Sequence, residues 1–211
     1  MCIKNFKLLF PAVLLSLLLL AAGCSKDDFS NGISVSEINV KNPVGESSES
    51  IDFVEVEFNN KQFMTVDFMD NGFTVNLPET VEDYYLMDIK DDFPKGLNIS
   101  DPQAKICYLS MEGGDYESDL KGNEFRRQYE YRNMEYNGPD EAPETEGFYI
   151  YTDRDVAITG KTEGDFFTPI SCSLSLKKGW NLYFWTRDHT DDFGKETYSH
   201  KEPKGMQWWA R

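Results

Sequence analysis

The sequence predicts an all-β domain, an antiparallel β-sandwich with one short helix, with an open β-barrel as the alternative. Three observations support this prediction. Apolar residues recur at every second position in many short segments between residues 51 and 210. Turn-forming residues, such as Asn71-Gly72 and Gly113-Gly114, separate these segments. A single stretch has the apolar spacing of a helix. Short strands of this kind pack as two layers around one core.

Alternation is clear in the first strands. Residues 54–58 place Val and Phe on one side and Glu on the other. The Asn and Lys residues at 59–61 can turn the chain into a second strand over 63–66. Asn71-Gly72 precedes a third strand over 73–77, and the pattern predicts tight hairpins between these segments.

One short helix is expected near residue 80. Thr80 can cap it, and Asp83 stands at the spacing of a capping box. Val81, Tyr85 and Ile89 then follow at the spacing of one apolar helix stripe. Such a helix would pack over one end of a sheet.

The second half of the chain returns to strands. Seven are expected, over residues 104–111, 125–136, 148–151, 156–160, 171–176, 180–186 and 206–210. Lys177-Lys178-Gly179 should join the fifth and sixth of these as a hairpin. Gly179 would supply a backbone conformation with positive φ, and Trp180 would pack into the core directly after the turn.

The N-terminus has the order of a secretory signal peptide. Lys4 and Lys7 are followed by an apolar run from Leu8 to Ala22, broken only by Pro11 and Ser16. That run is too short for a typical membrane-spanning helix, which needs about 20 residues. We therefore expect cleavage before Cys24, and an uncleaved N-terminal anchor is the alternative.

The residues around the cut carry two resemblances. Ala21-Ala22-Gly23-Cys24 resembles the bacterial lipobox, which implies a lipid on Cys24 and effectively permanent attachment to a membrane. Cys24-Ser25-Lys26-Asp27-Asp28 resembles the export signal of Bacteroidetes surface lipoproteins, which implies an outer-membrane protein exposed on the cell surface. The alternative for the second motif is a solvated acidic tether.

A broader resemblance covers residues 50–211. The segments Phe73–Pro78, Leu174–Asn181 and Gly205–Trp208 resemble uncharacterised Bacteroidetes-type surface lipoproteins. These are strand and turn motifs, so the resemblance implies a β-rich surface domain and no catalytic residues.

The expected organisation has three parts. Residues 1–23 form the signal peptide, residues 24–50 form the lipidated Cys24, a tether and a first strand, and residues 51–211 form a single sandwich domain. Loss of Lys4 and Lys7 leaves 19 basic and 37 acidic residues, a net charge of −18. This charge argues against nucleic acid as a partner and favours a neutral or cationic ligand, although acidity also keeps a surface protein soluble.

Two cysteines remain after Cys2 is removed and Cys24 is lipidated. Cys107 and Cys172 lie in strand-like segments of an exported chain, so one disulfide is permitted. Two free buried thiols are the competing interpretation.

Motifs for catalysis, cofactors or metals are lacking. The acidic segment around His189 lacks the spacing of a calcium or zinc site and is interpreted as a solvated loop. Gly160-Lys161-Thr162 lacks the first glycine of a phosphate-binding loop, and no Gly-x-Ser-x-Gly elbow occurs. The sequence therefore predicts a protein that is not an enzyme and that needs no cofactor or metal.

Aromatic residues are the best functional lead. Because a strand exposes alternate residues on opposite faces, rings near the C-terminus must occupy both faces. One face can be core, and the other can be a ligand platform or a covered edge. The candidate binding rings are Tyr183, Trp185, Trp208 and Trp209.

Three functions remain in competition. The first is a non-enzymatic binding or adhesion module for a glycan, a peptide or an envelope protein. The second is a structural or assembly subunit of an envelope complex. The third is a surface hydrolase with an unrecognised carboxylate pair. A concave site with aromatic rings favours the first, a large apolar patch the second, and carboxylates that share a cleft the third.

Overall fold

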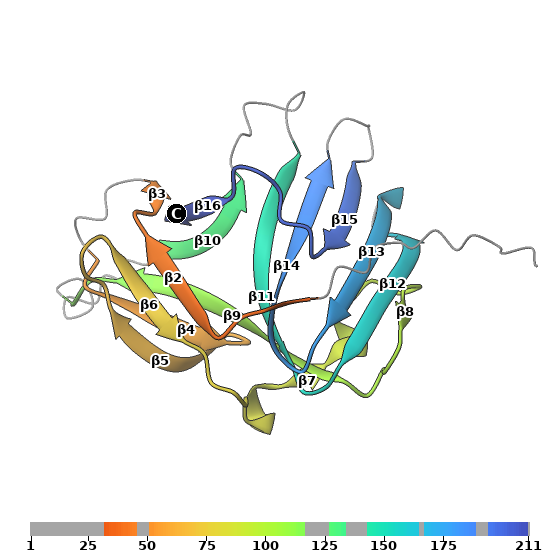
Figure 1. Ribbon diagram of the computed structural model, residues 1–211, viewed down its shortest axis with the longest axis horizontal. Coiled ribbons are helices and arrows are strands. Elements are labelled where there is room, and N and C mark those ends of the chain that lie inside the picture. The colour runs from red at the N-terminus through yellow and green to blue at the C-terminus, as the bar shows by residue number, and fades with distance from the viewer. Residues whose placement is uncertain are drawn as a thin grey trace, which may run out of the picture.

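The computed structural model describes residues 32–45, 51–116, 127–133, 143–164, 167–188 and 194–210. The predicted signal peptide, Cys24 and His189 lie outside these residues. The described part is almost entirely β, as predicted (Figure 1).

Most strands belong to one large mixed sheet. Along its main path the order is β3 (Val44–Gly45), β16 (Gln207–Ala210), β10 (Arg127–Asn133), β9 (Lys105–Gly114), β11 (Glu144–Thr152), β14 (Gly179–Asp188), β15 (Lys195–Ser199), β13 (Pro169–Leu176), β12 (Val156–Glu163) and β8 (Asn98–Ile99). Neighbours on this path pair antiparallel except β3–β16 and β13–β15, which are parallel. The path has two different ends, so the sheet stays open and is not closed into a barrel.

Shorter strands complete the two layers. β4 (Phe53–Phe58) and β5 (Lys61–Asp67) continue the sheet from β9, while β2 (Glu37–Lys41) and β6 (Gly72–Asn76) form a separate two-stranded sheet. β1 (Ile33–Ser34) pairs with β14, and β7 (Met87–Asp88) pairs with β9. Figure 1 shows β2, β4, β5 and β6 together at one side and β11 to β15 as a curved wall at the other.

Strand β9 connects these two parts. Residues 106–108 pair with β11, whereas residues 109–114 pair with β4 and residues 112–113 with β10. One continuous strand therefore belongs to both layers, which explains how a single sheet can form a sandwich.

Two hydrophobic clusters fill the fold. Cluster one lies around β2, β4 and β6 and includes Val40, Val56, Phe58, Val75 and Trp180. Cluster two lies between the curved wall and residues 89–106 and includes Ile89, Ile106, Ile158, Leu174 and Tyr183. Because β14 contributes Trp180 to one cluster and Tyr183 to the other, both faces of this strand are covered.

The predicted short helix is absent as such. Two single 3₁₀ turns, η1 (Asp83–Tyr85) and η2 (Ile89–Asp91), stand on either side of β7. The residue before η1 is Glu82, and its side chain makes no capping bond. The reason lies in the packing: Tyr85 packs against cluster one, whereas Ile89 belongs to cluster two. A straight helix with one apolar stripe cannot reach two separate cores.

Two predicted hairpins are also wrong. β6 pairs along its length with β2 and not with β5. β13 and β14 are not neighbours, because β15 lies between them, parallel to β13 and antiparallel to β14. The turn at Asn59 and Asn60 is confirmed, with φ of 49° and 59° in a β4–β5 hairpin.

The cysteines follow the second interpretation, that of two free thiols. Cys107 is in cluster one, and its Sγ donates to the carbonyl of Tyr108 at 3.4 Å. Cys172 is in cluster two, and its Sγ donates to the carbonyl of Ile158 at 3.3 Å. Burial raises the pKa of each thiol to about 12. The thiols lie in different cores with different partners, so the suggested disulfide is not formed.

Trp180 is placed as the sequence predicts. Gly179 has φ +102°, and Trp180 is only 4% exposed. The indole contacts the rings of Phe58 and Tyr151, and its Nε1–H donates to the carbonyl of Pro78 at 3.0 Å. The strand that follows Gly179 therefore begins with a core residue.

Candidate functional site

The end of the curved wall around Glu144, Arg187 and Glu196 has two chemically different faces. Residues that pair directly across antiparallel strands lie on the same face, so the register defines both. We name the first the Glu196 face; one row on it is Arg132, Glu146, Trp185 and Tyr198, and the next is Glu144, Arg187 and Glu196. We name the second the Lys161 face; one row on it is Lys161, Ser171, Thr197, Thr186 and Thr145.

A buried cation organises part of the Glu196 face. Arg132 on β10 is only 5% exposed. Its Nη1 donates to Oε2 of Glu130 at 2.6 Å, and its Nη2 donates to Oε1 of Glu144 on β11. A buried guanidinium with two carboxylate partners is costly to separate from them, so these ends of β10 and β11 are held together.

Trp185 and Tyr198 lie directly opposite each other on β14 and β15. The Trp185 Nε1–H donates to Oε2 of Glu196 at 3.2 Å. Burial, and then the charge of Glu196, raise the pKa of Tyr198 to about 12. These two half-buried rings are therefore fixed beside a carboxylate.

A cleft of about 700 Å³ opens next to this carboxylate. Its walls come from the segment after η2, the end of β12 and the strands β13, β14 and β15. The lining residues are Asp92, Pro94, Lys95, Glu163, Gly164, Thr168, Ile170, Arg187 and Glu196. The Nε of Arg187 is buried and has no hydrogen-bond partner within the described residues. Three carboxylates and two cations thus share one cleft.

Asp92 connects the cleft to cluster two. It accepts a hydrogen bond from the Tyr108 hydroxyl at 2.6 Å, and the Tyr108 and Tyr183 hydroxyls are 3.2 Å apart. Burial raises the pKa of Asp92, and the Tyr108 bond opposes this shift. Burial also raises the pKa of both tyrosines, so their hydroxyls stay protonated at neutral pH. Asp92, an exposed residue of the cleft wall, is therefore held in place by the Tyr108 hydroxyl.

The four candidate rings have different positions. Tyr183 is 4% exposed and stacks on Phe148 with ring centroids 5.5 Å apart, so the structure places this ring in the core and not beside the cleft. Trp185 stands beside the cleft. Trp209 opposes Glu130 on the Glu196 face, and its Nε1 is buried without a partner in the described chain.

Trp208 points to the opposite face from Trp209. It stacks on Tyr149, with an interplanar angle of 5° and ring centroids 6.1 Å apart. It also lines a small cavity of about 130 Å³ where β9, β10 and β11 diverge. That cavity can hold only a few waters, so Trp208 is a packing residue more than a platform.

Metal ligands, membrane spans and relatives give no further lead. Within the described ranges, no group of three His, Cys, Asp or Glu residues could hold a metal ion. None of the helical turns described is long and apolar enough to cross a bilayer. No protein family, curated protein or solved structure matches the chain. Fold and site together define an open all-β sandwich with a mixed-charge, aromatic-flanked cleft at one end.

Sequence reasoning missed the cleft carboxylates. Glu196 lies on β15, a strand that was not predicted, and Asp92 follows a 3₁₀ turn where a helix was expected. One signal was available. The alternation of Glu144, Glu146 and Phe148 places both glutamates on the face of Trp185, and Glu196 lies on that same face.

Proposed function

We propose that this protein is a lipid-anchored module on the cell surface that binds an uncharged, hydroxyl-rich ligand, a segment of a glycan, in the Glu196 cleft. The observation that carries the proposal is the composition of the cleft, in which three carboxylates and two cations lie together and one of the carboxylates, Glu196, accepts a hydrogen bond from the Trp185 indole. Its volume of about 700 Å³ is within the range of small-molecule sites.

The chemistry of the cleft favours a neutral glycan. Carboxylates of Glu163 and Glu196 accept hydrogen bonds from sugar hydroxyls, while Arg187 and Lys95 donate to sugar oxygens. Trp185 and Tyr198 offer apolar ring surface for the C–H faces of a sugar. A net charge of −16 for the chain disfavours polyanionic ligands over long range.

The anchor is a separate part of the proposal. The lipobox-like segment that ends at Cys24 supports lipidation, and the acidic residues after it support export to the outer surface of the outer membrane. Cys24→Ser should abolish labelling with a fatty-acid probe and release the protein from membranes in the native host. Labelled, membrane-bound Cys24→Ser protein would contradict the anchor.

Binding can be tested with residues 25–211 on a panel of neutral, amino and acidic oligosaccharides. We expect binding to a neutral oligosaccharide, with Glu196→Gln and Trp185→Ala each weakening it several-fold. Glu79→Gln is a matched control, because Glu79 is exposed and lies outside the cleft. If the control weakens binding as much as Glu196→Gln, the cleft is not the site.

A hydrolase is the second candidate function, and one observation favours it. Asp92 has a raised pKa and lines the same cleft as Glu163 and Glu196. Glycoside hydrolysis uses two carboxyl groups that flank the glycosidic bond, and this cleft supplies three. Release of reducing ends from a bound oligosaccharide, lost in Asp92→Asn, would favour this candidate over simple binding.

An assembly subunit has less support. The exposed large apolar side chains come from separate segments of the described chain, with one each at Ile33, Val44, Met69, Tyr84, Tyr116 and Phe167. An interface with another envelope protein would be expected to gather such residues on one surface.

A further inference from the structure

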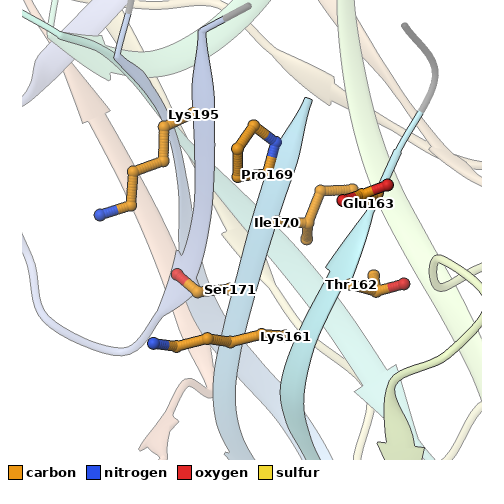
Figure 2. A pocket seen from close by; sticks show the side chains of 7 residues that line it. All are labelled: Lys161, Thr162, Glu163, Pro169, Ile170, Ser171 and Lys195. Carbon is orange, nitrogen blue, oxygen red and sulfur yellow. The ribbon is translucent and has the colours of Figure 1, made fainter. Parts of the chain in front are cut away.

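The Lys161 face carries a second hollow, of about 490 Å³, which shares Glu163 and Ile170 with the lining of the cleft (Figure 2). It lies over the adjoining ends of β12, β13 and β15. Figure 2 shows the ammonium groups of Lys161 and Lys195 and the hydroxyl of Ser171 on the same side of these strands, with Thr162 on the other side. Three strands therefore present hydrogen-bond donors on the same side of the sheet.

The surroundings of this hollow are rich in hydroxyl groups. Lys161 pairs in register with Ser171, and Ser171 with Thr197. The Ser171 and Thr197 hydroxyl oxygens are 3.3 Å apart, and further along the row those of Thr145 and Thr186 are 3.0 Å apart. The row thus carries one ammonium group and four hydroxyls, with no carboxylate.

Neither Lys161 nor Lys195 is held in an ion pair by the described residues. Within the described residues, no Asp or Glu oxygen lies within ion-pair distance of Lys161 or Lys195, whereas Lys90 and Lys177 each have one. Lys178 and Lys201 likewise have no such partner among the described residues, so what distinguishes Lys161 and Lys195 is the hollow that they share. The alternation of β15 turns Glu196 to the opposite face, whereas Glu163 lies at the rim of the hollow and Asp188 of β14 pairs in register with Lys195.

We propose that this hollow is an oxyanion-binding site, in which Lys161, Lys195 and Ser171 hold a carboxylate, sulfate or phosphate group. Ammonium groups bind such anions as compact charges with several donors, and a hydroxyl adds a directional hydrogen bond. The hollow and the Glu196 cleft meet at Glu163 and Ile170, but the donors Lys161, Lys195 and Ser171 lie on the opposite face from Arg187 and Glu196.

The charge of Glu163 should oppose the binding of an anion in this hollow. This residue lines the same hollow as the two lysines, and its negative charge opposes an incoming anion. Removing that charge should tighten anion binding, whereas removing either lysine charge should weaken it. A merely structural role for these exposed residues would not produce opposite changes.

The test uses the full chain in detergent and inorganic phosphate as the probe. Acetic anhydride modifies accessible lysines, and mass spectrometry reports the extent at each position. We expect phosphate at millimolar concentration to protect Lys161 and Lys195 more than sodium chloride of equal ionic strength does, while Lys178 and Lys201 stay unprotected. Equal protection by chloride, or equal protection of all four lysines, would overturn the site.

Variants then resolve the contributions. Lys161→Gln should raise the phosphate concentration that half-protects Lys195 by up to about fivefold, the range of one exposed charge pair. Glu163→Gln should lower that concentration, and the matched control Lys178→Gln should leave it unchanged. An effect of Lys178→Gln as large as that of Lys161→Gln would show only a general charge effect and would refute the proposal.

Two further experiments complete the test. One identifies the source of the anion, and the other separates this site from the proposed glycan site. A uronic-acid trisaccharide that protects at lower concentration than phosphate would assign the site to a polymer-borne carboxylate, and the reverse order would assign it to a free tetrahedral anion. Glu196→Gln should leave phosphate protection intact. Loss of glycan binding in that variant and loss of lysine protection are therefore separate failures.

Discussion

Strand β14 carries two tryptophans five residues apart, and they have opposite environments. Trp180 is enclosed by Phe58 and Tyr151, and its indole N–H donates to a backbone carbonyl. Trp185 is half-buried, lies opposite Tyr198, and donates to the carboxylate of Glu196. An odd spacing in a strand places the two rings on opposite faces.

The difference teaches what determines the role of an aromatic residue in this fold. Both tryptophans lie in the same alternating strand. What differs is the part of the molecule that covers each ring. The near end of β14 has cluster one against it, whereas the far end lies beside a cleft lined by charged groups. The covering segments come from distant parts of the sequence, and the following variants measure how far the contrast extends.

The largest effect is expected for Trp180→Ala. The substitution leaves a cavity in cluster one and an unpaired carbonyl at Pro78, so the free energy of unfolding should fall by about 3–5 kcal/mol. Urea or thermal unfolding of the purified domain measures this loss. An unchanged melting temperature would show that Trp180 is not a core residue and would remove the contrast with Trp185.

A smaller loss is expected for Asn181→Ala, one residue further along. The fully buried Asn181 side chain accepts from the Lys177 N–H at 2.8 Å and donates to the carbonyls of Lys177 and Gly179 at 2.7 and 2.9 Å. It therefore closes the turn that positions Trp180. Leaving these backbone groups unpaired should cost about 1–3 kcal/mol. A double variant with Trp180→Ala that shows simple additivity would contradict this coupling.

Much of the fold could be predicted, because strand alternation is a local signal. The expected strands over 104–111, 156–160 and 171–176 correspond to β9, β12 and β13. Pairing was less predictable. β15 begins at Lys195, and its residues Lys195–Ser199 lack an apolar alternation, so nothing local announces a strand that inserts between β13 and β14.

The site was predictable only in part, for the same reason. Trp185 could be named from its position in an aromatic strand, but its partner Glu196 belongs to the strand that was missed. Asp92 is exposed and becomes distinctive only through its hydrogen bond from the hydroxyl of Tyr108, which is 16 residues away in sequence. Long-range pairing thus created the cleft from residues without a local motif.

His200 gives a pH-dependent test of the inserted strand. Its Nε2 accepts from the Ser175 N–H at 2.9 Å, so its Nδ1 must carry the proton that is shared with the carbonyl of Leu182 at 3.1 Å. The neutral ring thereby bridges β13 and β14 just beyond the last residue of β15. Burial lowers the pKa of His200 from its usual 6.5.

The sign of the pH effect follows from that lowered pKa. Between the pKa of His200 in the folded state and 6.5, the unfolded chain binds more protons, so stability falls as pH drops through this window. The loss is about 1.4 kcal/mol for each tenfold difference in proton affinity between the folded and unfolded states. Urea unfolding at pH 7.5 and 5.5 should show it in the native protein and not in His200→Gln. Asp92 acts in the opposite direction but is present in both proteins, so its contribution cancels.

The smallest effect on stability is expected for Trp185→Ala. The ring is half-buried beside an open cleft, so water can fill the space and no closed cavity forms. The free energy of unfolding should fall by only about 1 kcal/mol. Ligand binding should fall several-fold in the same variant, because one ring surface is lost and Glu196 loses the donor that orients it.

Trp180→Ala, measured where it remains folded, should show the reverse pattern, with a large loss of stability and unchanged affinity. Equal losses of stability in both variants would show that Trp185 is a core residue as Trp180 is, which would contradict its role as a ligand ring beside the Glu196 cleft.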